Sequence, residues 1–238
     1  MDFTICLAKK NILIHSVNSR IYKTCSDYLV EEKPDIEICV DETMLLKEVQ
    51  RIKEQDGEDV SLRDAEDLLV HRLIAESLLD YDIILMHGAV VADGHRSYLF
   101  TAKSGTGKTT HIQKWLDNVE GSFVVNGDKP LIILNDDGAF ACGTPWCGKE
   151  HLGTNTIVPL YSIILMERST DNHIEEVSFG SVFHLILQQT YQSTDANKMR
   201  KILRMLMKLK EKVRIYRFYF DNYKDDCFQV VYDALTKQ

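Results

Sequence analysis

The chain carries the sequence SYLFTAKSGTGKTTHIQKWLDN at residues 97–118. The apolar start of this stretch predicts a strand, and its end predicts a helix. The glycine-rich segment between them closes on Gly107, Lys108 and Thr109, as in the pattern G-x-x-x-x-G-K-[ST]. Such a loop points successive backbone N–H groups inward, where they hold phosphate oxygens, and the following helix adds its positive end. We therefore expect a loop that binds the phosphates of a nucleoside triphosphate.

Individual roles follow from this pattern. Lys108 would reach the β- and γ-phosphates, and the Thr109 hydroxyl would bind magnesium. Alanine at position 102 replaces the first glycine of the pattern and would be strained at a positive φ, whereas Gly105 can supply that conformation. A chance glycine-rich turn is the alternative, which the strand before and the helix after disfavour. The expected nucleotide-binding residues are Ser104, Gly105, Thr106, Gly107, Lys108, Thr109 and Thr110.

Turn signals place hairpins on both sides of this loop. Asp93-Gly94 separates two expected strands before it, and the segment 135–138, Asn-Asp-Asp-Gly, separates two after it. A doubly wound parallel sheet would instead alternate strands and helices throughout. We therefore expect an α/β fold with a mixed, largely antiparallel sheet and flanking helices.

An acidic, polar stretch at residues 54–59 is the expected linker. It predicts a small N-terminal α+β unit at residues 1–58 and a P-loop nucleotide-binding domain at residues 59–238. Within the first unit, a helix is expected over residues 22–30.

Composition excludes several classes of partner. The 238 residues carry a net charge of −8, so no general basic field attracts nucleic acid. No segment approaches the ~20 apolar residues that cross a bilayer, and the apolar N-terminal run lacks the basic leader of a secretory signal. Six scattered cysteines are typical of a reduced cytoplasmic protein. Cys142 and Cys147 form a close pair, but with His151 they make an incomplete zinc site, so we expect ordinary loop residues.

Three further segments supply candidate catalytic residues. Asp128 ends an apolar strand after the loop, where an acid can face magnesium, although a turn aspartate is the alternative. His87 lies at the head of the preceding hairpin and could contact the γ-phosphate or the acceptor, or be a structural histidine. Lys149 could neutralise phosphate charge and Glu150 could be a metal ligand or base, the alternative being solvated loop charges. Thr109 and Asp128 are the expected magnesium ligands.

One basic stretch, residues 198–217, alternates with apolar residues. This pattern predicts the solvated face of an amphipathic helix, and binding of an acidic peptide or phosphate ligand is the alternative. His111, His173 and His184 are expected to be structural.

These residues resemble the HPr kinase/phosphorylase-type serine kinases and the related ATP-dependent phosphoenolpyruvate carboxykinases. The carboxykinases carry a Ser-Gly-Thr-Gly-Lys-Thr-Thr loop, which residues 104–110 match. The HPr kinase-like members place a His-Gly pair one hairpin before the loop, as His87-Gly88 does, and an Asp-Asp pair after it. This chain has Gly127-Asp128-Lys129 there, so one acid is missing.

The resemblance covers roughly residues 64–190, and the first 55 residues resemble the N-terminal part of small stand-alone members, some of which are associated with peptide modification. It implies a phosphoenolpyruvate carboxykinase-like P-loop fold with a small N-terminal α+β appendage. In the family the Asp pair is tied to proton transfer and the metal. Asp128 would then serve one of these two roles, proton transfer or metal binding, and Glu150 or His87 would serve the other.

The resemblance implies an ATP- and Mg²⁺-dependent kinase that transfers the γ-phosphoryl group to a serine-like hydroxyl of a peptide, protein or small molecule. The expected catalytic residues are Lys108, Asp128, His87, Glu150 and Lys149. The missing acid keeps open an ATP-binding regulatory or partner-binding module with little or no transfer. A carboxykinase-like lyase is disfavoured because the chain is short. ATP is preferred over GTP because the segment 197–200, Asn-Lys-Met-Arg, lacks the acid of a guanine signature, and a homo-oligomer stays open.

Overall fold

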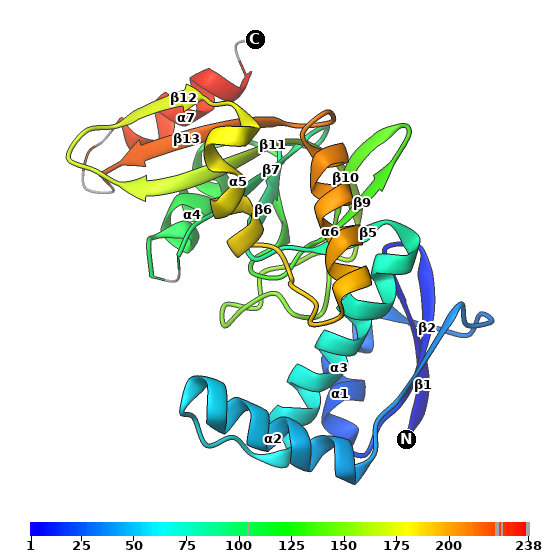
Figure 1. Ribbon diagram of the computed structural model, residues 1–238. Coiled ribbons are helices and arrows are strands. Elements are labelled where there is room, and N and C mark those ends of the chain that lie inside the picture. Colours follow the sequence, from blue (N-terminus) through cyan, green and yellow to red (C-terminus); the bar gives the residue numbers. More distant parts are fainter. Residues whose placement is uncertain (104, 222–223, 225, 237–238) are drawn as a thin grey trace. The chain divides into compact units, whose positions relative to one another are not determined.

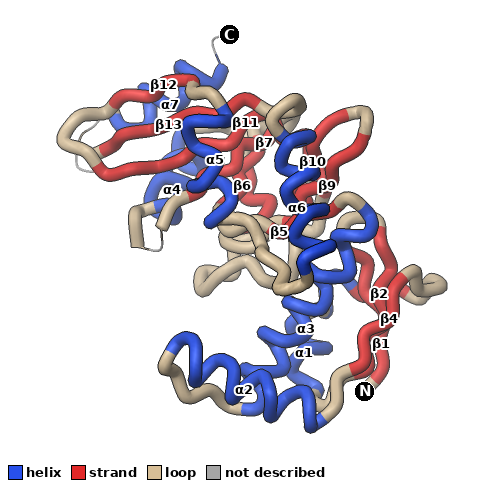
Figure 2. Tube along the Cα trace, viewed as in Figure 1, coloured by secondary structure: helices blue, strands red, loops and turns tan. Residues whose placement is uncertain are grey.

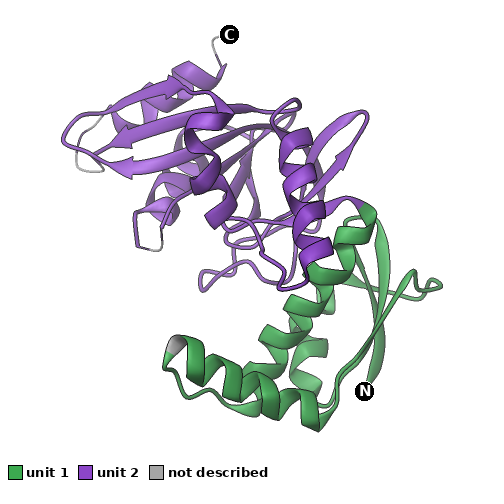
Figure 3. Ribbon diagram, viewed as in Figure 1, with its two compact units in different colours: residues 1–81 green, residues 82–238 purple. Residues whose placement is uncertain are grey.

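The chain divides into two units after Tyr81 (Figure 3). The computed structural model describes residues 1–103, 105–221, 224 and 226–236. The division lies later in the chain than the predicted boundary after residue 58. The reason is the helix over residues 62–78, which packs against the two preceding helices and the last strand of unit 1.

Unit 1 is a small α+β unit built on a four-stranded sheet with the order β3-β1-β2-β4. Alternation along its strands buries Phe3 and Ile5 of the first strand and Ile12 and Ile14 of the second, and leaves polar side chains on the opposite face. Its elements are β1 (Asp2–Leu7), β2 (Lys10–His15), α1 (Ser19–Thr24), the 3₁₀ helix η1 (Ser26–Tyr28), β3 (Leu29–Val30), β4 (Ile36–Cys39), α2 (Glu42–Asp56), α3 (Leu62–Leu78) and the 3₁₀ helix η2 (Leu79–Tyr81).

The helix predicted over residues 22–30 is wrong in its second half. The first helix ends at Thr24, and Leu29 and Val30 pair with Ile5 and Thr4 of β1. Pairing with an already formed strand satisfies the backbone of these two residues, and local sequence gives no sign of it.

Unit 2 contains most of the strands and the phosphate-loop candidate (Figure 1). Its elements are β5 (Ile83–Leu85), β6 (Ala89–Ala92), β7 (Ser97–Thr101), α4 (Lys108–Asn118), β8 (Phe123–Asn126), β9 (Leu131–Asn135), β10 (Gly138–Cys142), β11 (Ile157–Arg168), β12 (His173–Glu176), α5 (Phe179–Gln188), α6 (Ala196–Leu209), β13 (Arg214–Phe220) and α7 (Cys227–Thr236).

The sheet of unit 2 is mixed and mostly antiparallel, with the order β5-β9-β10-β11-β7-β6-β8 and β13 added on β11. The long strand β11 pairs with β10 through its first residues and runs parallel to β7 and β13 further on. This arrangement confirms the expected mixed α/β class with flanking helices. Because β7 and β11 are parallel, their carboxyl ends lie at the same edge of the sheet.

Helices enclose this sheet (Figure 2). Trp115 of α4 is fully buried in an aromatic core with Tyr98 and Phe100 of β7, and α7 adds Val231 to the same cluster. The first part of the basic stretch lies in α6, which buries Ile202, Met205, Leu206 and Leu209, as predicted for an amphipathic helix, and the stretch ends in β13. In the described part of the chain, no helix is both long and apolar enough to cross a membrane.

We predict that Trp115→Ala lowers the free energy of unfolding by about 3–5 kcal/mol, because it leaves a cavity between β7 and α7. Urea unfolding followed by circular dichroism would measure this loss. The matched control is Gln113→Ala on the exposed face of the same helix, where a change within about 0.5 kcal/mol is expected. Equal losses in the two variants would contradict the assignment of this core.

Candidate functional site

The glycine-rich loop leaves a buried strand and enters a helix, as the sequence predicts. All five residues of β7 are buried, and α4 begins at Lys108 with Gly107 as its N-cap. Gly105 has φ 74° and Gly107 has φ 120°, whereas Ala102 takes no positive φ. Alanine therefore fits the first position without strain, and the extra glycine supplies the left-handed conformation. Ser104, an expected phosphate-binding residue, lies outside the described residues.

Two cations hold the carbonyl side of this loop. Lys108 Nζ donates to the Ala102 carbonyl at 3.0 Å. Arg168, the last residue of β11, donates through Nε to the Thr106 carbonyl at 3.1 Å and through Nη2 to the Gly105 carbonyl at 2.9 Å. With its carbonyl groups bound on this side, the loop keeps its shape.

The Lys108 ammonium is half-buried at the start of α4. Burial lowers the pKa of this lysine, the charge of Asp128 opposes the shift, and the charge of Lys129 adds to it. A desolvated ammonium at a helix N-terminus is well suited to an anionic ligand. The negative charge of the ligand stabilises the charged lysine, which burial has deprived of hydration.

His87 contacts both Thr101 of β7, the strand before the glycine-rich loop, and Asp128, which follows β8. Its Nε2 lies 3.2 Å from Asp128 Oδ1, and its Nδ1 lies 2.8 Å from Gln189 Oε1. The hydroxyl of Thr101 donates to the His87 carbonyl at 2.7 Å, one residue before the loop begins. At the next position, Gly88, a Cβ atom would lie 2.8 Å from the Phe100 carbonyl oxygen, so only glycine fits there.

Asn126 fixes the backbone on which Asp128 stands. Its buried Oδ1 accepts hydrogen bonds from the N–H groups of Asp128 at 2.9 Å and Lys129 at 2.7 Å. Its Nδ2 donates to Thr144 Oγ1 at 2.9 Å, and that hydroxyl donates to the Lys129 carbonyl. One buried amide therefore ties the Asp128 turn to the loop that carries Lys149 and Glu150.

The Asp128 carboxyl is ionised at neutral pH. Burial raises its pKa, but the hydrogen bond from His87 and the charges of Lys129, His87 and Lys108 together outweigh burial, so the pKa lies below its ordinary value. An ionised, partly buried carboxylate beside this glycine-rich loop suits a hard cation.

An open pocket of about 750 Å³ collects most of the expected site residues. Thr106, also an expected ligand, lies outside this lining and contacts the adjoining pocket beyond the loop. The pocket is lined by His87, Gly105, Gly107, Lys108, Thr109, Thr110, Gly127, Asp128, Gly148, Lys149, Glu150 and Arg168.

Sequence reasoning missed Arg168, Gln189, Asn126 and Thr144. Only the parallel pairing of β11 with β7 brings Arg168, the last residue of β11, to the loop. Gln189 directly follows α5, which ends at Gln188. Asn126 carried a local signal, since an asparagine before Gly-Asp often accepts backbone N–H groups in a turn.

The position before Asp128 has no room for a side chain. A Cβ atom at Gly127 would lie 2.6 Å from the Cys147 carbonyl oxygen and 3.1 Å from that of Leu152. No side chain fits there while the loop over residues 143–153 holds its place. Glu150 lines the same pocket as Asp128 and is the other carboxylate in this lining.

Comparisons with known proteins do not show a family for this chain. No family model and no curated protein matches the chain. Among solved structures, the Hpr(Ser) kinase/phosphatase from Coxiella burnetii is similar, with 8% identity and a TM-score of 0.35 over 64% of this chain and 93% of that chain. A likeness this distant does not show a family or a function, so the function has to be inferred from the residues of the site.

We predict that Gly127→Ala destabilises the protein by about 1–3 kcal/mol, because the methyl group displaces backbone at Cys147. Thermal or urea unfolding would measure the effect. Gly180→Ala is the matched control: nothing lies near a Cβ at this position of α5, so it should leave stability unchanged or raise it by up to about 1 kcal/mol. A neutral Gly127→Ala would refute the crowding argument.

Asp128 should also give a pH signature in stability. Its folded pKa lies below the unfolded value of about 3.9, so its stabilising contribution is complete above that value and is lost as the pH falls through the folded pKa. We therefore expect the difference in unfolding free energy between wild type and Asp128→Asn to shift in favour of the variant as the pH falls below about 4. Urea unfolding from pH 7 to pH 3 would measure it, and a constant difference would contradict the assigned shift.

Proposed function

We propose that this chain is an ATP- and Mg²⁺-dependent phosphotransferase that moves the γ-phosphoryl group to a serine-like hydroxyl of a peptide, protein or small molecule. One observation carries the proposal: a single pocket brings Lys108 and Thr109 of the phosphate loop together with the His87–Asp128 pair. The proposed function implies a phosphoenolpyruvate carboxykinase-like P-loop fold, with the α+β unit 1 as an appendage. The six free cysteines favour the cytoplasm as its place of action.

The loop binds the triphosphate in this scheme. Backbone N–H groups over residues 105–110 would surround the phosphate oxygens, and the first turn of α4 leaves its N–H groups without acceptors inside the helix. Lys108 exchanges its contact with the Ala102 carbonyl for the β- and γ-phosphates.

The donors in the pocket fit magnesium. The Thr109 hydroxyl and the ionised Asp128 carboxylate are hard oxygen ligands, which Mg²⁺ prefers to nitrogen or sulfur. When bound there, the ion would neutralise charge on the β- and γ-phosphates.

Transfer forms a bond between the acceptor oxygen and the γ-phosphorus and breaks the bond to the β-phosphate oxygen, which releases ADP. The acceptor O–H proton goes to a carboxylate in the pocket. If Asp128 held the magnesium, Glu150 would take this proton. If Glu150 held it, Asp128 would take the proton, with His87 beside its Oδ1. Lys149 and Arg168 line the pocket and stabilise the transferring phosphoryl group.

A second function is favoured by the single carboxylate after β8, where Asp128 stands between Gly127 and Lys129. Under it, the chain is an ATP-binding regulatory or partner-binding module, and ATP holds a conformation without transfer. The two functions share the phosphate loop and differ in turnover.

The deciding experiment incubates the purified protein with γ-labelled ATP, magnesium and a lysate of its source. Wild type should label a protein, peptide or small molecule, and Lys108→Ala should lower the rate by at least about 100-fold, because it removes a preorganised charge from the phosphoryl group. Lys210→Ala, an exposed lysine at the end of α6, is the matched control and should keep the full rate.

Either of two results would overturn the kinase. An unchanged rate in Lys108→Ala would place the activity elsewhere. Tight ATP binding with only slow release of free phosphate would favour the binding module.

A further inference from the structure

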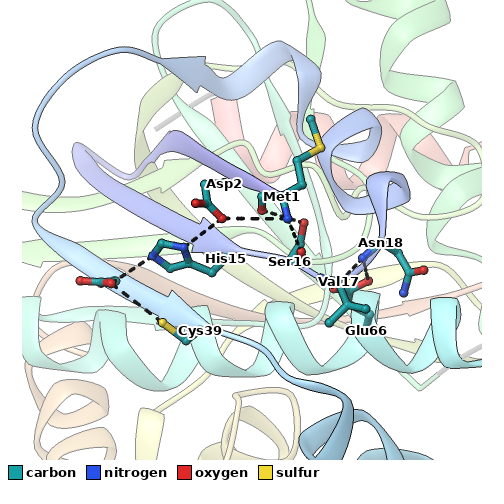
Figure 4. Close-up of polar contacts among 9 residues, drawn as sticks. Met1, Asp2, His15, Ser16, Val17, Asn18, Cys39 and Glu66 are labelled. Carbon is teal, nitrogen blue, oxygen red and sulfur yellow. Dashed lines mark hydrogen bonds and ion pairs between the residues drawn. The ribbon is translucent and has the colours of Figure 1, made fainter.

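A second group of chemically reactive side chains lies in unit 1, on the polar face of its sheet (Figure 4). His15 ends β2 and is paired in register with Asp2 on β1 and with Cys39 on β4. Paired positions project to the same face, so these three side chains form one row across three strands. Glu37 precedes Cys39 by two residues and therefore projects to this face as well.

The ligand atoms of this row are close together. His15 Nε2 lies 3.0 Å from Glu37 Oε1, and Cys39 Sγ lies 3.9 Å from the same oxygen. The three ligand atoms all lie within 4.8 Å of one another. Tetrahedral zinc has bond lengths of about 2.0–2.3 Å, which place its ligand atoms about 3.3–3.8 Å apart. Small rotations of exposed side chains would therefore bring all three atoms onto one ion.

Asp2 completes the arrangement from the other side of the imidazole. Its Oδ1 lies 3.0 Å from His15 Nδ1, while Nε2 faces Glu37 and Cys39. A metal-binding histidine usually donates its other ring N–H to a carboxylate, which fixes the tautomer and the ring orientation. Asp2 thus holds His15 with Nε2 directed toward Glu37 and Cys39.

We propose that His15, Glu37 and Cys39 bind a thiophilic divalent cation, with Zn²⁺ the best match, and that Asp2 positions His15 for it. Imidazole, thiolate and carboxylate together suit zinc, whereas magnesium and calcium prefer oxygen ligands alone. The exposed fourth position is open to water. Because the ligands belong to β2 and β4, the ion also links these two strands.

This site is independent of the proposed phosphotransferase. Every residue in it belongs to unit 1, and none lines the phosphate pocket. Loss of the metal site and loss of phosphoryl transfer can therefore be told apart.

The test uses untagged full-length protein and Co²⁺ as the spectroscopic probe. We expect one cobalt ion per chain, a thiolate-to-cobalt charge-transfer band in the near ultraviolet, displacement by Zn²⁺, and no displacement by excess Mg²⁺. Cys39→Ser should abolish the band. Asp2→Asn should keep the band and weaken binding by about 10–100-fold, because it removes only the carboxylate that orients His15.

Cys6→Ser is the matched control, since Cys6 is a partly exposed thiol on the same face of β1, four residues from Asp2 and outside the cluster. It should bind cobalt as wild type does. All substitutions lie outside the buried face of the sheet, and circular dichroism would confirm that each variant folds. Absence of the band in wild type, its persistence in Cys39→Ser, or equal affinity in Asp2→Asn and wild type would overturn the proposal.

Discussion

The buried side chain of Asn126 is the polar group on which the geometry of the pocket depends. It accepts from two backbone N–H groups of the Asp128 turn and donates to Thr144, and so it binds two loops that are far apart in sequence. A buried amide is costly unless its hydrogen bonds are made, so this arrangement favours one conformation over its neighbours. Asp128, Lys149 and Glu150 are carried by the backbone that Asn126 holds, and their spacing around the pocket follows from it.

The hairpin order and the phosphate loop were predictable because their signals are local. Asp93-Gly94 marks a turn, and Gly105 and Gly107 take the positive φ values that glycine allows. The features that the sequence did not predict depend on contacts between distant segments. β3 forms only because β1 lies beside it, and Arg168 reaches the loop only because β11 runs parallel to β7. The assembly of His87, Lys108 and Asp128 in one pocket agrees with the sequence reasoning, while the roles given to these residues stay predictions.

The glycine before Asp128 has a structural cause. Gly127 lies against the Cys147 carbonyl, so a side chain there would separate the two loops that Asn126 joins. Close packing of the backbone and a second acid at this position exclude each other. The pocket instead offers Glu150 on an exposed turn, where a carboxylate has more freedom to move than one fixed to the end of a strand.

The clamp on the phosphate loop has a thermodynamic consequence. Gly105 and Thr106 belong to a glycine-rich surface loop. The backbone of such a loop ordinarily loses much conformational entropy when it binds a ligand. Arg168 already holds both of their carbonyl groups, and the buried strand β7 anchors the start of the loop. That entropy is therefore lost when the protein folds. Under the proposed function, an entering anion would meet a preorganised backbone, so more of the free energy of its contacts would be retained as affinity.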